Sequence, residues 1–445
     1  MKTNIKKYTK VLLMVAVTLG AASCKKGYFY DGINNDPTQL QKPIPTNLLP
    51  GIIQSTGYEW GGDASRFTSI FMQQVTGAAN QSYSATNYSV SSDDVDNMWS
   101  FGLYGGIMNN ANAMVKLADA NGQAHYAAIG RILLANALGL TTDLWGDIPY
   151  SQAFQGNANL QPKYDSQQQI YTTIDNLLTT AITQLAASEN SIQPGSDDKL
   201  YSGDLTKWTK FAHSLRAKFF LHLAKVDASN YSKAITEAQS GFTSSNDDAV
   251  VNFSETSVNT ENPWSQFNSQ RGDIEFTGYI YDLLNKNGDP RLDVYSDGGG
   301  GLGALYGNSN SPVYLMSYDE LQFIIAEAQF QTGNKQAAAT AYNAGVAANL
   351  GRTVGSSTYA ATVAKTSGSI ALNDIMTQKY IANFLNPEVW TDWRRTGLPA
   401  LTPAAGGVLN GQIPRSLLYP SGEQRYNTNT PPNTGGMLRR VWWDK

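Results

Sequence analysis

The clearest structural signal in this chain is Ala326-Glu327-Ala328-Gln329-Phe330-Gln331-Thr332-Gly333-Asn334. Small side chains recur before a Gly-containing turn, and Ala338, Ala341-Tyr342 and Ala344 follow it. Small residues let two antiparallel helices approach closely, and Gly tolerates the backbone of the turn between them. The segment therefore predicts a pair of helices that pack against each other.

This helix pair resembles one tetratricopeptide unit. A single unit cannot bury its own apolar face, so at least three are expected to stack on one another. The rest of the sequence contains no clean copy of the repeat, so the other pairs must be degenerate.

Apolar residues at offsets of three and four predict further amphipathic helices. In the most regular of these, Ser166 is placed to cap a helix that runs to Leu185. The apolar stripes are Tyr171, Ile174, Leu177, Leu178, Ala181, Ile182 and Leu185; Trp99, Leu103, Ile107, Met114 and Leu117; Ile129, Leu133, Leu134, Ala137 and Leu138; and Leu321, Ile324, Ile325 and Ala328. Stacked helix pairs would bury these faces.

Long irregular stretches are expected between the helices. They lie near residues 242–272, 296–313, 352–370 and 400–435. Loops of this length usually bind a ligand or are disordered.

The N-terminus has the features of a bacterial lipoprotein signal. Lysines precede an apolar run from Val11 to Leu19, which is too short to span a bilayer, and small residues then lead to Cys24. We predict cleavage before Cys24, the only cysteine in the chain, and acylation of its thiol. Ala21 stands where Leu is usual in such a motif, so secretion with a free thiol remains an alternative.

The predicted organisation is a signal peptide (1–23), an acylated and extended arm (24–50) and one helical domain (51–445). Loss of the N-terminal lysines moves the net charge from −4 to −8, which disfavours binding to nucleic acid or anionic lipid. Acylated Cys24 cannot form a disulfide, so a large apolar core must stabilise the fold. No second apolar run of membrane length follows, so the lipid is expected to be the membrane anchor.

Histidine and glycine patterns give no strong sign of a metal or cofactor site. His213 and His222 lie nine positions apart, on opposite faces of one helix, and His125 stands alone. No zinc site is therefore predicted. The run Gly298–Gly303 fits a dinucleotide-binding pattern, but no strand before it or helix after it is evident, so we interpret it as a flexible loop.

Paired acids need separate consideration because two carboxylates are all that a glycosidase requires. The candidates are Asp143 with Asp147, and Asp319 or Glu320 with Glu327. Glu320 and Glu327 share a helix face with core residues, which favours a capping or buried structural role. We predict no catalytic residue, no metal site and no cofactor.

Aromatic residues are the positive signal for ligand binding, because 9 Trp and 24 Tyr exceed what core packing obviously requires. Flat rings beside Asn and Gln hold sugars: the ring stacks on the apolar face of a pyranose while amides bond its hydroxyls. For any single ring, the alternative is that it plugs a gap between a loop and a helix. The predicted ligand-binding residues are Trp60, Tyr83, Tyr88, Trp264 and Tyr306, and Tyr58 has similar polar surroundings. The tryptophans predicted to be core are Trp99, Trp145, Trp208, Trp390 and Trp393.

Several phrases spread over nearly the whole mature chain carry a family resemblance. They are Thr142-Asp143-Leu144-Trp145-Gly146-Asp147-Ile148-Pro149-Tyr150, Phe211-Ala212-His213-Ser214-Leu215-Arg216, Asp289-Pro290-Arg291-Leu292, Leu315-Met316-Ser317-Tyr318-Asp319-Glu320-Leu321-Gln322-Phe323-Ile324-Ile325-Ala326-Glu327-Ala328, Trp390-Thr391-Asp392-Trp393-Arg394-Arg395-Thr396-Gly397, Ile413-Pro414-Arg415 and Tyr419-Pro420. In this order they resemble the SusD/RagB family of outer-membrane lipoproteins, in the branch described as starch-binding and outer-membrane associated.

The resemblance implies a mostly α fold in which about four tetratricopeptide-like helix pairs form a superhelix packed against a loop-rich region. It also implies a protein that is not an enzyme. Such a protein is anchored by lipid in the outer membrane, faces the cell exterior, and passes an oligosaccharide or peptide to a SusC-like TonB-dependent transporter. The shared phrases are expected to be structural, with Arg394 and Arg395 tying a helix end to carboxylates and Asp289-Pro290-Arg291 fixing a turn. The aromatic residues that bind ligand vary within the family, so none is assigned by motif.

Three other functions remain open. The first is a peptide-binding lid of the same kind of transporter. The second is a periplasm-facing scaffold that binds proteins through the helix-pair array. The third is a secreted glycoside hydrolase.

Overall fold

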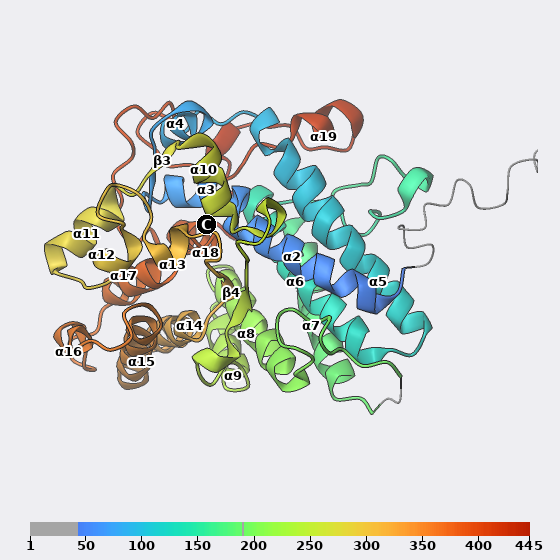
Figure 1. Ribbon diagram of the computed structural model, residues 1–445, viewed down its shortest axis with the longest axis horizontal. Coiled ribbons are helices and arrows are strands. Elements are labelled where there is room, and N and C mark those ends of the chain that lie inside the picture. The colour runs from blue at the N-terminus through green and yellow to red at the C-terminus, as the bar shows by residue number, and fades with distance from the viewer. Residues whose placement is uncertain (1–42, 189–190) are drawn as a thin grey trace, which may run out of the picture. The chain divides into compact units, whose positions relative to one another are not determined.

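The computed structural model describes residues 43–188 and 191–445. The expected signal peptide (1–23), the lipid attachment site Cys24 and the expected arm as far as residue 42 lie outside the described residues. Residues Pro45–Lys445 form one unit that is mostly helical (Figure 1), which confirms the predicted fold class.

Long helices make up most of the first half of this unit. The α-helices are α2 (Pro45–Gly61), α3 (Asp63–Phe71), α4 (Asn80–Thr86), α5 (Asn109–Ala120), α6 (Ala124–Trp145), α7 (Gln167–Leu185), α8 (Leu205–Leu223) and α9 (Ser229–Ala238). The other elements are the strands β1 (Thr76–Gly77) and β2 (Ala249–Val251), the 3-10 turns η1 (Asp93–Val95), η3 (Gly156–Ala158) and η4 (Ser245–Asp247), and the π-helix η2 (Met98–Met108).

Shorter helices and one long pair follow in the second half. The α-helices are α10 (Pro263–Arg271), α11 (Tyr279–Asn287), α12 (Leu292–Tyr295), α13 (Ala304–Gly307), α14 (Tyr318–Gln331), α15 (Lys335–Thr353), α16 (Tyr359–Val363), α17 (Leu372–Ala382), α18 (Glu388–Thr396) and α19 (Ser421–Tyr426). The remaining elements are the strands β3 (Ile274–Glu275) and β4 (Val313–Met316) and the 3-10 turns η5 (Val258–Thr260) and η6 (Gly436–Leu438). The stretches expected to be irregular therefore contain short helices, among them α10, α13, α16 and α19.

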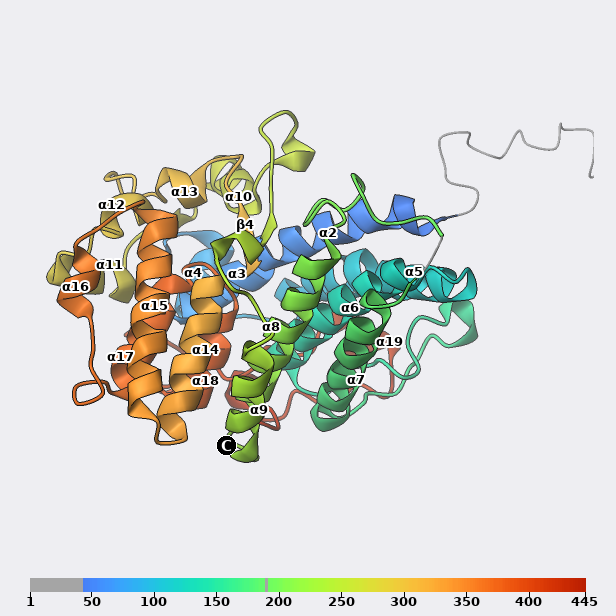
Figure 2. The same ribbon diagram turned by 90° about the horizontal axis from the view of Figure 1, so that it is seen from below.

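The helix pair predicted around Gly333 is α14 with α15, which lie side by side (Figure 2). Gly333 adopts a φ of +86° in the turn, and the Asn334 side chain caps α15 by accepting a hydrogen bond from the Ala337 N–H at 3.2 Å. Gly345 of α15 packs against the ring of Phe323, leaving no room for a larger side chain. Close packing through small residues is thus confirmed.

Other predicted helices also form where their caps indicated. The Ser166 hydroxyl accepts a hydrogen bond from the Gln169 N–H at 3.3 Å, and the Gln169 side-chain oxygen accepts one from the Ser166 N–H. Together they form a capping box for α7. Helix α6 packs against α5 and α7, and α8 packs against α9. These contacts bury the predicted apolar stripe of α6 and most of that of α7, where Leu177 and Ile182 are partly buried.

Helix α2 begins at Pro45, so residues 45–50 are helical and do not belong to an extended arm. Pro suits the first position of a helix because its φ is already helical and its missing N–H would be unpaired there. Leu49 and Ile52 are fully buried, so packing of the first turns against the core favours the helix.

The stripe Trp99, Leu103 and Ile107 is buried as predicted, but its backbone is a π-helix. A spacing of four residues fits the wider π turn as well as it fits an α-helix. Because π-helices are rare and often occur at functional sites, η2 marks a region to inspect.

Two small antiparallel sheets join segments that are distant in the sequence. Strand β1 pairs with β3, and β2 pairs with β4. The tryptophans predicted to be core are all buried. Within residues 43–188 and 191–445, no helix has both the length and the apolar character needed to cross a membrane.

Candidate ligand-binding site

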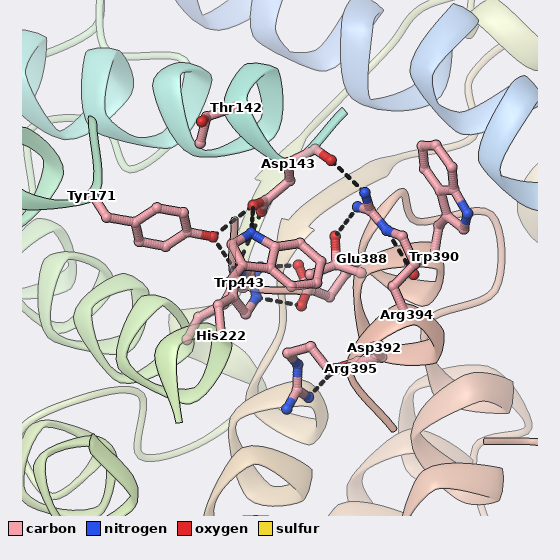
Figure 3. Close-up of polar contacts among 12 residues, drawn as sticks. Thr142, Asp143, Tyr171, His222, Glu388, Trp390, Asp392, Arg394, Arg395 and Trp443 are labelled. Atoms are coloured by element: carbon pink, nitrogen blue, oxygen red, sulfur yellow. Dashed lines mark hydrogen bonds and ion pairs between the residues drawn. The ribbon is translucent and has the colours of Figure 1, made fainter. Parts of the chain in front are cut away.

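Carboxylates and bases from distant segments meet in the interior (Figure 3). His222 lies between two acids: its Nε2 is 2.7 Å from Glu388 Oε1, and its Nδ1 is 3.2 Å from Asp143 Oδ2. Asp143 also accepts hydrogen bonds from the Tyr171 hydroxyl at 2.6 Å and from Trp443 Nε1 at 2.9 Å. Asp143 therefore links α6, α7, α8 and the C-terminal segment.

The histidine in this cluster is held in its charged form. Burial lowers the pKa of His222, but the carboxylates of Glu388 and Asp143 outweigh burial and raise the pKa to about 9. Burial also opposes ionisation of Glu388, yet His222 and Lys218 hold the pKa of Glu388 well below its usual range. A charged imidazole clamped between two carboxylates has no free ring nitrogen to act as a general base.

The ionic network continues through the core. Lys218 Nζ lies 2.8 Å from Glu320, and Lys379 Nζ lies 2.8 Å from Asp392. The bases of this cluster are Lys218, His222, Lys379, Arg394 and Arg395, and its acids are Asp143, Glu320, Glu327, Glu388 and Asp392, all of them buried. Acids and bases are equal in number, so the buried charges compensate one another.

The two arginines predicted to tie a helix end to carboxylates behave differently. Arg395 pairs with Glu327 at 2.7 Å and with Asp392 at 2.6 Å, as predicted. Arg394 instead donates to the main-chain carbonyl of Asp143 at 2.6 Å, so the predicted carboxylate contact is wrong for this residue. A guanidinium has five N–H donors and can hold irregular backbone through its carbonyls. The turn predicted at Asp289-Pro290-Arg291 is confirmed by an ion pair of 2.6 Å between its first and last residues.

The acids considered for catalysis have structural partners. Asp319 pairs with Arg352 at 2.7 Å, and Glu320 contacts Lys218. The cavity beside Asp143 and Glu388 has a volume of about 20 Å³, which leaves no space for a sugar ring. This arrangement supports the interpretation of Asp143, Asp319 and Glu320 as buried structural groups.

The five aromatic residues predicted to bind ligand do not lie together. Trp60, Tyr88, Trp264 and Tyr306 are buried, whereas Tyr83 in α4 has 57% of its surface exposed. Trp60, Trp264 and Tyr306 belong to α2, α10 and α13, and not to loops. Ligand binding by these five residues stays a prediction, and Tyr83 is the one with a ring open to solvent.

The buried candidates make contacts that fill gaps between elements. Trp264 Nε1 donates to Ser65 Oγ at 2.9 Å, and the Tyr88 hydroxyl accepts a hydrogen bond from the Ala404 N–H at 3.0 Å. Trp264 and Tyr306 line a shared cavity of about 40 Å³, a volume suited to water and not to a pyranose.

An open groove lies between α2 and η2. Its volume is about 560 Å³, which is within the range of small-ligand sites. The groove is lined by Gln54, Ser55, Tyr58, Glu59, Asp63, Asn97, Phe101 and Gly102. Phe101 has 77% of its surface exposed, and Tyr58 is held edge-on against Phe253 with ring centroids 5.6 Å apart. An exposed ring beside amides and carboxylates can stack on a sugar while the polar groups bond its hydroxyls.

Glycines let the two walls of the groove approach each other. A side chain at Gly102 would collide with the carboxylate of Glu59, and one at Gly106 would press on Ser55. Gly105 and Gly106 also face carbonyls of the preceding π turn that a Cβ would crowd. The glycines therefore bring η2 against α2 beside exposed Phe101.

Glu59 is the unusual ionisable group of the groove. Burial raises its pKa to about 8, against the opposing effect of Arg66. Its Oε2 is shielded from solvent and accepts no hydrogen bond from the described residues. Arg66 contacts Asp63 and lies 4.1 Å from the centre of the Phe267 ring, so its guanidinium is engaged elsewhere.

The sequence analysis named Tyr58 as an aromatic residue with polar neighbours, but it did not identify Phe101 or Glu59. Phe101 lies two positions after Trp99 and off the apolar stripe, which is a sign of an exposed ring on a polar helix face. The burial of Glu59 depends on Gly102 from another helix, and no local pattern shows that contact.

Comparison with protein families gives one match over most of the chain. The SusD-like family, described as starch-binding and associating with the outer membrane, matches residues 37–308 and 301–420. A comparison with curated proteins gives no match.

Solved structures of similar fold cover nearly the same length. A chitin-binding protein aligns with a TM-score of 0.77 at 23% identity, over 90% of this chain and 100% of its own. A chitin-binding SusD homolog from Flavobacterium johnsoniae gives 0.75 at 22% identity, over 90% and 98%. A SusD/RagB family protein from Bacteroides thetaiotaomicron gives 0.73 at 22% identity, over 91% and 99%. At these identities the structures establish a shared fold.

Proposed function

Because the chain belongs to the SusD-like family of starch-binding proteins associated with the outer membrane, we propose that it binds an oligosaccharide and delivers it to a SusC-like TonB-dependent transporter. It does so as a lipoprotein anchored through Cys24 on the outer face of the outer membrane. Its role is capture and transfer, without chemical conversion of the glycan.

The observation that carries this proposal is the open groove between α2 and η2. Exposed Phe101 and half-buried Tyr58 offer ring surfaces, while Gln54 and Asn97 offer amides to sugar hydroxyls. Of the acids first considered for hydrolysis, Asp143, Glu320 and Glu327 lie instead in the closed ionic network of the core, which supports a binding role. The two chitin-binding proteins of similar fold support a glycan in preference to a peptide.

Replacing Phe101 with Ala is expected to weaken glycan binding by roughly 1 to 3 kcal/mol, or about 5- to 150-fold in Kd, because a stacking ring is removed. The fold should be unchanged, since the side chain is 77% exposed. A glycan array would identify a binding oligosaccharide, and titration calorimetry would give its Kd for both proteins.

Tyr426→Ala is the matched control, because Tyr426 is 69% exposed but does not line the groove. Tyr83→Ala tests the exposed aromatic predicted from sequence. Loss of affinity in Tyr83→Ala with wild-type affinity in Phe101→Ala would move the site to α4. Binding of peptides with no binding of any glycan would replace the oligosaccharide with the peptide alternative.

Replacing Cys24 with Ala is expected to move the protein from the membrane fraction to the soluble fraction, because the acylated thiol is removed. Extraction of the tagged wild-type protein in mild detergent should recover a SusC-like transporter in stoichiometric amount, whereas the soluble variant should recover less. Fractionation and mass spectrometry measure both results.

Two results would contradict this part of the proposal. Cys24→Ala that stays in the membrane would exclude the predicted anchor. Wild-type protein that resists protease added to whole cells, and that co-purifies with periplasmic proteins in place of a transporter, would favour the scaffold alternative.

A further inference from the structure

The groove between α2 and η2 is acidic as well as aromatic. Among the described residues that line it, Glu59 and Asp63 are acids and none is a base. The whole chain also has more acidic than basic residues, with a net charge of −4.

The two acids differ in what they contact. Asp63 pairs with Arg66, so its charge is compensated. Glu59 has no such partner at Oε2, although this atom is enclosed by the groove wall. A buried carboxylate oxygen without a donor is costly, and a ligand that supplies a charged N–H donor would relieve that cost.

The charged groups around Glu59 do not bond its Oε2 atom. On its own helix, Tyr58 is the neighbouring ionisable residue. From α3, Asp63 and Arg66 face it, and Arg66 is in turn near Arg271 of α10. Helix η2 contains no Asp, Glu, Lys, Arg or His, and its tyrosine, Tyr104, donates its hydroxyl hydrogen bond to the Pro149 carbonyl. No basic side chain from the surrounding elements therefore contacts Oε2.

We propose that Glu59 makes this groove selective for glycans that carry a free amine, so that a protonated amino sugar donates from its ammonium group to the Glu59 carboxyl while a pyranose ring stacks on Phe101. This inference rests on the proposed glycan-binding function and names the class of glycan. Amines are charged near neutral pH, whereas the acetamido and hydroxyl groups of other sugars are neutral.

Selectivity for an amine would be accompanied by release of a proton from Glu59. Burial raises the pKa of Glu59 to about 8, so without ligand the carboxyl holds a proton at pH 6.5. An ammonium beside the Glu59 carboxyl favours the ionised carboxylate, and the proton then passes to the buffer. A neutral sugar in the same place leaves the proton on Glu59.

The test compares a glucosamine tetramer with an N-acetylglucosamine tetramer, using the full-length protein in detergent. Titration calorimetry at pH 6.5 in two buffers of different ionisation enthalpy measures both Kd and proton release. We expect the amino tetramer to bind about 10-fold or more tightly than the acetylated one and to release about one proton per bound oligomer. Glu59→Gln should bring the ratio of the two affinities close to unity and abolish proton release.

Glu275→Gln is the matched control, because Glu275 is an exposed glutamate of β3 outside the groove, and it should keep the wild-type ratio. A preference for the amino tetramer that survives in Glu59→Gln, or equal binding of both tetramers by the wild type, would overturn the inference. If both tetramers bind equally but Phe101→Ala weakens them, the proposed function stands and the selectivity does not. Tighter binding of a lysine peptide than of either tetramer would exclude an amino sugar as the ligand class.

Discussion

Replacing Arg395 with Ala is expected to destabilise the protein by about 3 to 5 kcal/mol, one of the largest effects of any single substitution in this chain. The guanidinium is 2% exposed and bridges Glu327 of α14 to Asp392 of α18. Removing it leaves Glu327 and Asp392 buried with less compensating charge. Lys379 pairs directly with Asp392, so Glu327 loses the arginine that pairs with it. The midpoint of urea unfolding, followed by circular dichroism, measures the loss.

Arg425→Ala provides the control for this substitution, since Arg425 is an exposed arginine of α19. The double variant Arg395→Met with Glu327→Leu should be less destabilised than Arg395→Ala, because it removes the unpaired acid and restores apolar volume. If Arg395→Ala shifted the midpoint no further than Arg425→Ala, the network would not have the structural role assigned to it.

Two of the helix signals read from the sequence depend on contacts within the element or its turn. Ser166 caps α7, and Gly333 forms the turn between α14 and α15, because both roles depend on neighbours a few residues away. The extended arm predicted to residue 50 ends earlier, because a helix begins at Pro45. This helix is decided by Leu49 and Ile52, which meet a core assembled from distant segments.

The candidate site was less predictable for the same physical reason. Trp264 and Tyr306 have polar neighbours in sequence, yet tertiary packing buries both rings. Phe101 is apolar but stays exposed, while the neighbouring Gly102 packs against Glu59 of α2. The accessibility of an aromatic ring is set by contacts between elements. The sequence therefore indicated that aromatic residues bind the ligand, but it did not indicate which rings are exposed.

Ionisation of His222 predicts the second large effect, a loss of stability at alkaline pH. The folded-state pKa of about 9 exceeds the ordinary value of 6.5. A group whose pKa is raised on folding contributes stability that is fully present below its unfolded pKa and is lost as pH rises through its folded pKa. The contribution of His222 should therefore be complete below pH 6.5, and a difference on the order of 3 kcal/mol should disappear by about pH 9 to 10.

The measurement is the free energy of unfolding of the wild type and of His222→Gln between pH 6 and 10. Ionisation of Glu59 and Asp248 also lowers the stability of the protein as pH rises, because burial raises the pKa values of these carboxyls to about 8 and about 7. The difference between the two proteins isolates His222, since these carboxyls titrate in both. The wild type should exceed the variant at pH 6.5, and the two curves should converge as the imidazole loses its proton. Parallel curves across this range would show that the imidazole is neutral in the fold, and Glu388 and Asp143 would then need another source of positive charge.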